Sequence, residues 1–211
     1  MGQYRLHCVG ESGNCYKVAL MLEFCGLPWE PVFVDYFGGE TRSDTYRQSV
    51  NELGEVPMLE ADGLRLTQSG AILTWLAQQT GRFGGRNDAE RMEVLRWMLF
   101  DNHKFTSYYA TLRWMVGIAG KNDPAVVEFL RARAVGAFQI VDKHLATRAF
   151  LLGDSPTIAD FSLVGYHYYD EATTIDRSEF PNLTAWIQRI RALPGWKHPY
   201  ELMPRGAERN E

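Results

Sequence analysis

The sequence predicts an α/β domain followed by an all-helical domain in a chain of 211 residues. Over residues 1–80, apolar runs of strand length alternate with helical runs in the order β-α-β-α-β-β-α. A stretch rich in glycine and basic residues follows at 81–87 and is typical of a linker. Strand patterns then cease and only helical periodicity continues, so we expect a second, helical domain over residues 88–211.

The first helix of the α/β domain marks its predicted functional edge. An apolar strand over residues 4–9 leads into Ser12-Gly13-Asn14, and the helix that follows ends at Gly26. Such a strand-turn-helix edge directs backbone N–H groups and the positive end of the helix dipole toward a bound anion. The Ser12 hydroxyl is placed to donate a hydrogen bond there.

The other elements follow from local signals in chain order. We expect a second strand over residues 29–35, a short helix over 43–50 and a helix that begins near Ala71. Between these helices, strands over residues 56–60 and 64–67 are joined by Ala61-Asp62-Gly63, which is a strong hairpin signal.

The helical domain begins with a helical pattern that runs from Asp88 toward Ala119. Asp123 is an N-cap before Pro124, which opens a helix to about Leu145. A capping box at Thr157 and Asp160 opens another helix, and its loss should cost about 0.5–2 kcal/mol. A last helix over residues 182–191 precedes a tail that we expect to be irregular.

Composition narrows the class of protein. Hydrophobic residues make up 45% of the chain and the formal net charge is -4, so there is no basic footprint for nucleic acid. No apolar run is long enough to span a membrane, and no signal peptide is apparent. Three cysteines do not make a disulfide framework. We therefore expect a cytoplasmic protein with no nucleic-acid or membrane partner.

Four short motifs occur in a characteristic order. They are Ser12-Gly13-Asn14, Gly54-Glu55-Val56-Pro57, Gln68-Ser69-Gly70-Ala71-Ile72, and Leu152-Gly153-Asp154 with Thr157-Ile158-Ala159-Asp160. With these motifs the chain resembles the cytosolic glutathione S-transferases, and most closely their bacterial serine-type, theta- or phi-like members. The resemblance covers nearly the whole chain. It implies a thioredoxin-like first domain, a helical-bundle second domain that contributes the electrophile pocket, and a homodimer.

The resemblance also implies a role for Ser12 as the catalytic residue. In serine-type members the matching hydroxyl donates to the glutathione sulfur and favours the thiolate, the nucleophilic form of the thiol. Asn14 or a backbone N–H could share this role. The alternative for Ser12 is a plain helix N-cap, and the two roles are compatible.

Further glutathione-binding residues carry over from the same motifs. The family holds the bond at Val56-Pro57 cis, so that Val56 pairs with the cysteinyl unit of glutathione; an edge-strand proline in the trans form is the alternative. Gln68 and Ser69 would meet the γ-glutamyl end, although many members have glutamate in place of Gln68; both could instead be plain caps. Arg42 could reach the glycyl carboxylate or simply remain solvated.

Aromatic residues in the helical domain supply candidates for the pocket of the second substrate. Phe105, Tyr108 and Tyr109 follow a polar interruption at residues 101–104, which suggests a helix that emerges at a cleft. We expect them to line a pocket for a small hydrophobic electrophile. Ordinary bundle core is the alternative.

The predicted reaction is conjugation of the glutathione thiolate to such an electrophile, with glutathione as co-substrate, no other cofactor and no metal. Two other functions stay open: a glutathione-dependent disulfide reductase or peroxidase, and a non-enzymatic glutathione-binding regulatory protein. The reductase would need an exposed thiol, for which Cys15 is the candidate. Cysteine at such a position is more often buried and slow to react.

Overall fold

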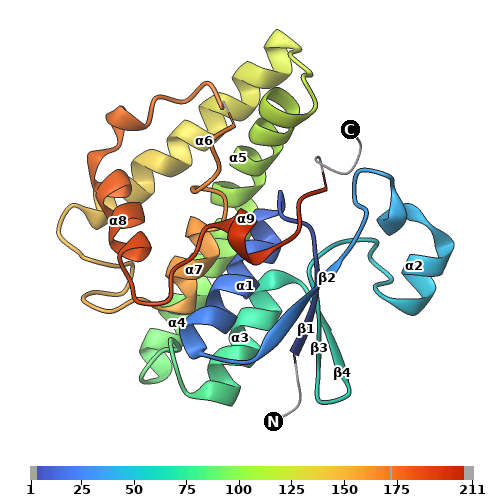
Figure 1. Cartoon of the computed structure of the whole chain (residues 1–211). Coiled ribbons are helices and arrows are strands. Elements are labelled where there is room, and N and C mark those ends of the chain that lie inside the picture. The colour runs from blue at the N-terminus through green and yellow to red at the C-terminus, as the bar shows by residue number, and fades with distance from the viewer. Residues whose placement is uncertain (1–3, 172, 207–211) are drawn as a thin grey trace. The chain divides into compact units, whose positions relative to one another are not determined.

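The computed structural model describes residues 4–171 and 173–206, which form two compact units. The first unit comprises residues 4–82 and 194–206, and the second comprises the described residues of 83–193 (Figure 1). The elements of the first unit are β1 (Tyr4–Cys8), α1 (Gly13–Cys25), β2 (Trp29–Phe33), the 3₁₀ turn η1 (Glu40–Arg42), α2 (Asp44–Ser49), β3 (Met58–Ala61), β4 (Leu64–Thr67), α3 (Ser69–Thr80) and α9 (Pro199–Leu202). This order confirms the thioredoxin-like α/β prediction for the first domain.

The first unit is built on a four-stranded sheet in the order β2-β1-β3-β4. β1 pairs parallel with β2, whereas the β1–β3 and β3–β4 pairs are antiparallel. Helices α1 and α3 pack together, and α1 also contacts β1 while α3 contacts β4. Side chains alternate across a strand, so Leu6 and Leu59, both fully buried, point to one face of the sheet, which forms the core.

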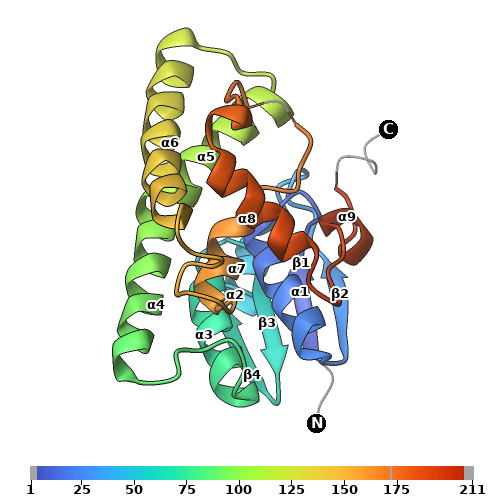
Figure 2. The ribbon, with the colours of Figure 1, turned by 90° about the vertical axis from the view of Figure 1, so that its left-hand side faces the viewer.

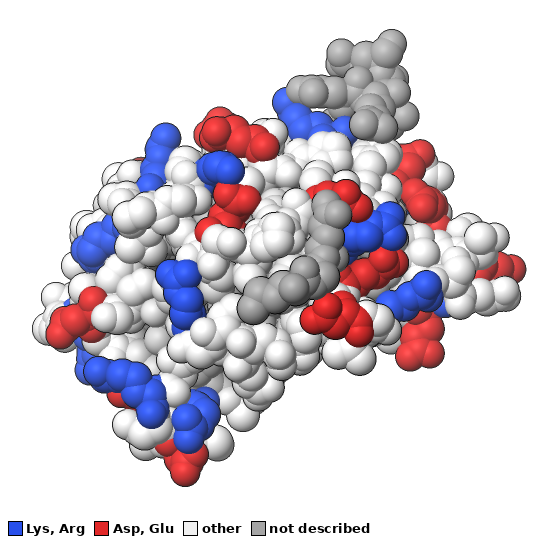
Figure 3. All heavy atoms as spheres, turned by 60° about the horizontal axis from the view of Figure 1, so that its bottom comes forward, with Lys and Arg blue, Asp and Glu red and all other residues white. Residues whose placement is uncertain are grey.

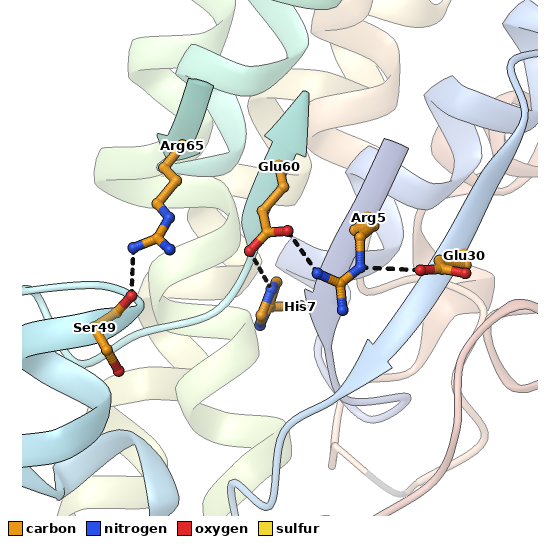
Figure 4. A network of polar contacts seen from close by, with 6 residues as sticks. All are labelled: Arg5, His7, Glu30, Ser49, Glu60 and Arg65. Carbon is orange, nitrogen blue, oxygen red and sulfur yellow. Dashed lines mark hydrogen bonds and ion pairs between the residues drawn. The ribbon is translucent and has the colours of Figure 1, made fainter. Parts of the chain in front are cut away.

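The opposite face of the sheet carries a row of alternating charges, one from each strand (Figure 4). Arg5 Nε donates to Glu30 at 2.9 Å and Arg5 Nη1 donates to Glu60 at 2.8 Å. His7 Nε2 lies 3.1 Å from the other oxygen of Glu60. Arg65 completes the row and donates to the carbonyl oxygen of Ser49, the last residue of α2. Opposite charges on neighbouring strands favour this register, and Arg65 also ties α2 to the sheet.

The second unit is entirely helical in its described residues, apart from short turns and an isolated bridge. Its elements are α4 (Asp88–Phe100), the π-helical turn η2 (Asp101–Phe105), α5 (Thr106–Arg113), a second π-helical turn η3 (Trp114–Ile118), α6 (Pro124–Leu145), α7 (Ile158–Val164), the 3₁₀ turn η4 (Arg177–Glu179) and α8 (Pro181–Arg191). Figure 2 shows α5 and α6 side by side, and they are in contact. The helical second domain is thus confirmed.

The long helix expected from Asp88 is interrupted where Asp101 is buried. The Asp101 carboxylate accepts hydrogen bonds from Thr106 Oγ1 at 2.5 Å and from Ser162 Oγ on α7 at 2.6 Å. The wider π-helical turn begins at Asp101 and closes with a bond from the Thr106 N–H to the Asp101 carbonyl. The helical periodicity after residue 105 is therefore displaced from that of α4.

Asp160 is a second buried carboxylate and fastens the start of α7. It accepts hydrogen bonds from the Thr157 N–H at 2.8 Å and from the Thr157 hydroxyl at 3.1 Å. The first of these and the reciprocal bond from the Asp160 N–H to the Thr157 side chain form the predicted capping box. The Asp160 carboxylate also accepts from the Leu151 N–H and from Trp186 Nε1 of α8, each at 2.9 Å. Asp160 thus joins a loop, α7 and α8.

The C-terminal end of the chain departs from the expected organisation. We expected residues 88–211 to form one helical domain with an irregular tail. In the structure residues 194–206 pack with the first unit, where they include the short helix α9 beside α1. The remaining predicted tail, residues 207–211, lies outside the described residues.

The exposed surface mixes both charges. Figure 3 shows lysine and arginine side chains interspersed with aspartate and glutamate on one face. Within residues 4–171 and 173–206, no helix is both long and apolar enough to cross a bilayer.

Replacing Asp160 should destabilise the protein more than loss of a cap alone. In Asp160→Ala, the N–H groups of Leu151, Thr157 and Trp186 lose a buried acceptor, and each buried unpaired group costs about 1–3 kcal/mol. We expect the free energy of unfolding to fall by about 3 kcal/mol or more in urea denaturation. Asp154→Ala, an exposed acid in the preceding loop, should change it by less than about 0.5 kcal/mol. Equal losses would contradict this role.

Acidification should destabilise the protein through His7. Burial lowers the His7 pKa below its ordinary 6.5 and outweighs the nearby Glu60 carboxylate, which raises it. The unfolded chain therefore binds the proton more readily than the folded chain, and the contribution to stability is lost as pH falls below about 6.5. Urea denaturation at about pH 8 and about pH 5 should show a smaller pH dependence for His7→Gln than for the wild type. His103→Gln, at an exposed histidine, is the control; an equal reduction there would remove His7 as the cause.

Candidate functional site

The register of the sheet brings the predicted site segments to one of its ends. Met58, at the start of β3, pairs with His7 near the end of β1 and with Thr67 at the end of β4. The turn after β1, the residues before β3 and the residues after β4 therefore leave the sheet at the same end. β2 runs parallel to β1, so the loop that leads to Arg42 also begins there. This end of the sheet is therefore flanked by all the segments that carry predicted glutathione-binding residues: 12–14, 42, 56–57 and 68–69.

Ser12 is the N-cap of α1. Its Oγ accepts a hydrogen bond from the Cys15 N–H at 3.3 Å, and its own N–H donates to the Val9 carbonyl at 3.1 Å. The capping bond uses a lone pair of Oγ and leaves the hydroxyl hydrogen able to donate. Ser12 and Asn14 are both partly exposed at this helix end, as an anion-binding role requires.

Cys15, in the first turn of α1 after Ser12, has an unreactive thiol. Cys15 is fully buried, and burial raises the pKa of its thiol to about 12 despite hydrogen bonds from Ser12 and the Val9 backbone that lower it. Burial also raises the pKa of Cys8 well above its ordinary value and raises that of Cys25. Cys15 therefore stays a neutral thiol near pH 7 and is a poor redox nucleophile.

The bond between Val56 and Pro57 is cis, as the resemblance implied. Pro57 is buried immediately before β3, and Val56 is partly exposed beside it. Pairing of Val56 with a bound peptide stays a prediction.

Gln68 and Ser69 form the start of α3, and a third residue joins them. Gln68 has a φ of 66° and a ψ of 113°, an unusual backbone conformation for a residue with a side chain, of the kind that clusters at binding sites. Its Nε2 donates to the Glu55 carboxylate at 2.9 Å. The sequence alone does not single out Glu55, although this residue lies within the Gly54-Glu55-Val56-Pro57 motif and contacts the predicted site residue Gln68. A carboxylate thus lies beside Gln68, where many family members have glutamate.

Arg42 lies at the end of η1 with an exposed side chain. Its guanidinium makes no ion pair with another residue in the described part of the chain. It is therefore available to a ligand carboxylate, and its role stays a prediction.

The three aromatic residues proposed for the electrophile pocket divide into two groups. Phe105 and Tyr109 are buried in the helical unit, where each ring packs against Phe138 and His167. This packing favours the alternative of bundle core for both. Tyr108 is partly exposed. The pocket role stays a prediction, and Tyr108 is its strongest candidate.

The described residues contain no cluster of side chains that could bind a metal ion. Within residues 4–171 and 173–206, no three side chains of His, Cys, Asp or Glu come together as potential metal ligands.

Two family models match the chain. The model described as the glutathione S-transferase N-terminal domain matches residues 11–79, and that described as the glutathione S-transferase C-terminal domain matches residues 105–194. Both predicted domains are thereby assigned to one family.

Individual proteins agree with these models. The chain is 32% identical to a maleylacetoacetate isomerase of Rhizobium meliloti (strain 1021), with 92% of this chain and 94% of that protein covered. It is 29% identical to the disulfide-bond oxidoreductase YfcG of Escherichia coli (strain K12), with 86% and 87% covered.

A solved structure supports the same assignment. It is a glutathione transferase family member from Pseudomonas fluorescens Pf-5 with two glutathione molecules bound. The match has a TM-score of 0.81 at 25% identity and covers 91% of this chain and 89% of that one. From the two family models and a 32% identical relative matched over nearly its full length, the chain belongs to the glutathione S-transferase family.

Proposed function

We propose that this protein is a glutathione transferase that conjugates the thiolate of glutathione to small hydrophobic electrophiles. The observation that carries the proposal is the Ser12 hydroxyl, which caps the N-terminus of α1 and is partly exposed there, beside a cysteine that stays un-ionised. Within this family, a hydrogen-bond donor in that position favours the thiolate of bound glutathione. Family membership alone does not choose among the reactions of the relatives.

Each end of glutathione has a suitable partner in the proposed mode. The N-terminus of α3, with Ser69, suits the γ-glutamyl carboxylate. The Glu55 carboxylate, held beside Gln68, supplies the negative charge that the γ-glutamyl ammonium attracts. Arg42 suits the glycyl carboxylate because its guanidinium matches a carboxylate with two parallel donors. Val56 would pair with the cysteinyl unit through its backbone.

These contacts would place the sulfur at the N-terminus of α1. A free thiol has a pKa of about 8.5, and a hydroxyl donor together with the helix dipole lowers this pKa. The thiolate then attacks the electrophile, the new carbon–sulfur bond forms and the leaving group departs. Asn14, partly exposed in the first turn, is the second candidate donor. Tyr108 would line the electrophile pocket.

A reductase is the second candidate, because one relative is named a disulfide-bond oxidoreductase and one structural neighbour holds two glutathione molecules. Burial of Cys15 argues against a mixed disulfide on this protein's own thiol. A reductase here would have to act through bound glutathione alone. If the protein reduced disulfide substrates with glutathione but did not conjugate glutathione to an aryl halide, that result would favour the reductase.

We also propose a homodimer in a reducing compartment such as the cytoplasm. Met92, Leu95 and Leu99 lie one turn apart on α4 and expose 63%, 46% and 61% of their surface. A continuous exposed apolar stripe on one helix is typical of a protein interface. Its occupant in this proposal is a second copy of the chain. All three cysteines are free, as expected in a reducing compartment.

Removing the Ser12 hydroxyl should reduce turnover more than glutathione binding. A charge-assisted hydrogen bond contributes about 1.5–3 kcal/mol, so kcat for an aryl halide should fall about ten- to hundredfold in Ser12→Ala. Glutathione affinity, measured by calorimetry, should change less than about threefold. Ser12→Thr keeps a hydroxyl and should retain most of the turnover.

The matched control is Asn87→Ala, which removes an N-cap from α4 far along the chain. It should cost stability, about 1 kcal/mol, without loss of kcat. If Ser12→Ala kept full turnover, Ser12 would not be the activating donor.

The dimer proposal predicts that Leu99→Lys shifts the protein toward single chains, because a charge in the apolar stripe opposes its burial. Sedimentation velocity measures the shift. Val126→Lys, at an exposed apolar position on α6, is the control and should leave the mass unchanged. A wild type that sediments as a single chain at all concentrations would contradict the proposal.

A further inference from the structure

The C-terminal residues 194–206 run along α1 from its end to its beginning. Lys197 Nζ forms an ion pair with Glu23, near the end of α1, at 2.7 Å. The backbone carbonyl of Lys197 accepts a hydrogen bond from Tyr16 Oη at 2.8 Å. Farther on, the Pro204 carbonyl accepts from the Gly10 N–H at 2.7 Å, in the turn before α1. We call residues 194–206 the C-terminal strap. It follows α1 and ends with Gly206 against Glu11, the residue before Ser12.

The strap ends on a buried carboxylate. Glu11, the neighbour of Ser12, is only 6% exposed. Its Oε2 accepts from the Gly206 N–H at 3.0 Å, and its Oε1 lies 3.8 Å from Arg205 Nε. A carboxylate next to the site is thus held by the last described residues of the strap rather than by solvent. Burying it without such partners would be costly.

Two glycines allow the strap to approach this closely. A Cβ on Gly10 would lie 3.0 Å from the Pro204 carbonyl oxygen and 3.2 Å from that of Met203. A Cβ on Gly206 would lie 2.7 Å from the ring of Phe37 and 3.1 Å from Val9. Both ends of the contact are therefore packed against backbone or side chains with no room for a methyl group.

The contact acts on the segment whose geometry the proposed reaction needs. Glu11 and Gly10 are fixed by the strap, and Ser12 is fixed at the same turn by its bond to Val9 and its cap on Cys15. A hydroxyl donor that must meet a sulfur is sensitive to displacement, and an error near 1 Å can cost about a hundredfold in rate.

We propose that Glu11 is a positioning residue that, through Gly206 and Arg205 of the C-terminal strap, fixes the turn carrying Ser12 for activation of the glutathione thiol. This rests on the proposed function. The C-terminal strap, although it lies at the other end of the sequence, thereby supports the proposed site. Glu11 touches neither substrate nor reacting atom in this role.

The test compares Glu11→Ala and Gly206→Val, which disrupt the contact from opposite sides. The first measurement is amide hydrogen exchange of residues 9–16 by mass spectrometry, which requires no activity. The second is the pH profile of kcat/KM for glutathione conjugation of an aryl halide. We expect both variants to exchange at least about tenfold faster in residues 9–16. We also expect kcat to fall roughly ten- to hundredfold and the acidic limb of the profile to move to higher pH.

Two further variants separate positioning from general stability. Glu23→Gln weakens the Lys197 ion pair at the other end of the strap and should leave the pH profile unchanged. Glu11→Gln keeps an acceptor for the Gly206 N–H and should recover part of the turnover lost in Glu11→Ala.

The outcomes are distinct. Unchanged exchange in residues 9–16, or faster exchange with an unchanged pH profile and kcat, would overturn the positioning role. A shift of the profile in Glu23→Gln as large as in Glu11→Ala would also overturn it, because the effect would then be general. A wild type that neither conjugates nor binds glutathione would overturn the proposed function and the positioning role with it. Faster exchange would then support only the mechanical contact between the strap and the turn.

Discussion

The pairing of Met58 with both His7 and Thr67 is the constraint on which the site depends. It aligns the end of β1, the start of β3 and the end of β4, so that three loops leave the sheet together. A slip of one residue in this register would turn Leu59 toward solvent and the charged Glu60 toward the core. The row Glu30, Arg5, Glu60 and Arg65 on the outer face opposes such a slip by matching opposite charges across all four strands.

With the register fixed, the site needs only local chemistry. Two helix N-termini, those of α1 and α3, begin at this end of the sheet and favour anionic groups. One would meet a thiolate and the other a carboxylate in the proposed mode. In the same proposed mode, Arg42, Glu55 and the Ser12 hydroxyl would add the side-chain groups that distinguish a zwitterionic peptide from a simple anion. Because burial keeps the Cys15 thiol un-ionised, the reactive sulfur of the proposed reaction would come from the bound peptide.

Much of this could be predicted from the sequence because the signals are local. The cap at Ser12, the hairpin at Asp62-Gly63 and the box at Thr157 and Asp160 depend on neighbours within four residues. The cis bond at Pro57 came from the resemblance and not from a local rule. The order of elements in the first unit follows from the same short-range patterns.

The missed features depend on contacts between distant parts of the chain. Glu55 meets Gln68 only because β3 and β4 pair in one register. Glu11 and Gly206 are 195 positions apart in the sequence, and a contact over that distance leaves no periodic pattern from which it could be predicted. The π-helical turn at Asp101 displaces the helical face after it, so the periodicity that begins at Asp88 does not show that Phe105 and Tyr109 are buried.

The central claim is that this end of the sheet lowers the pKa of a bound glutathione thiol. An ultraviolet difference titration of the wild-type protein saturated with glutathione, across pH, measures the thiolate directly. The account predicts that the bound thiolate forms clearly below the pKa of a free thiol, about 8.5. A bound thiol that titrates like free glutathione would contradict it.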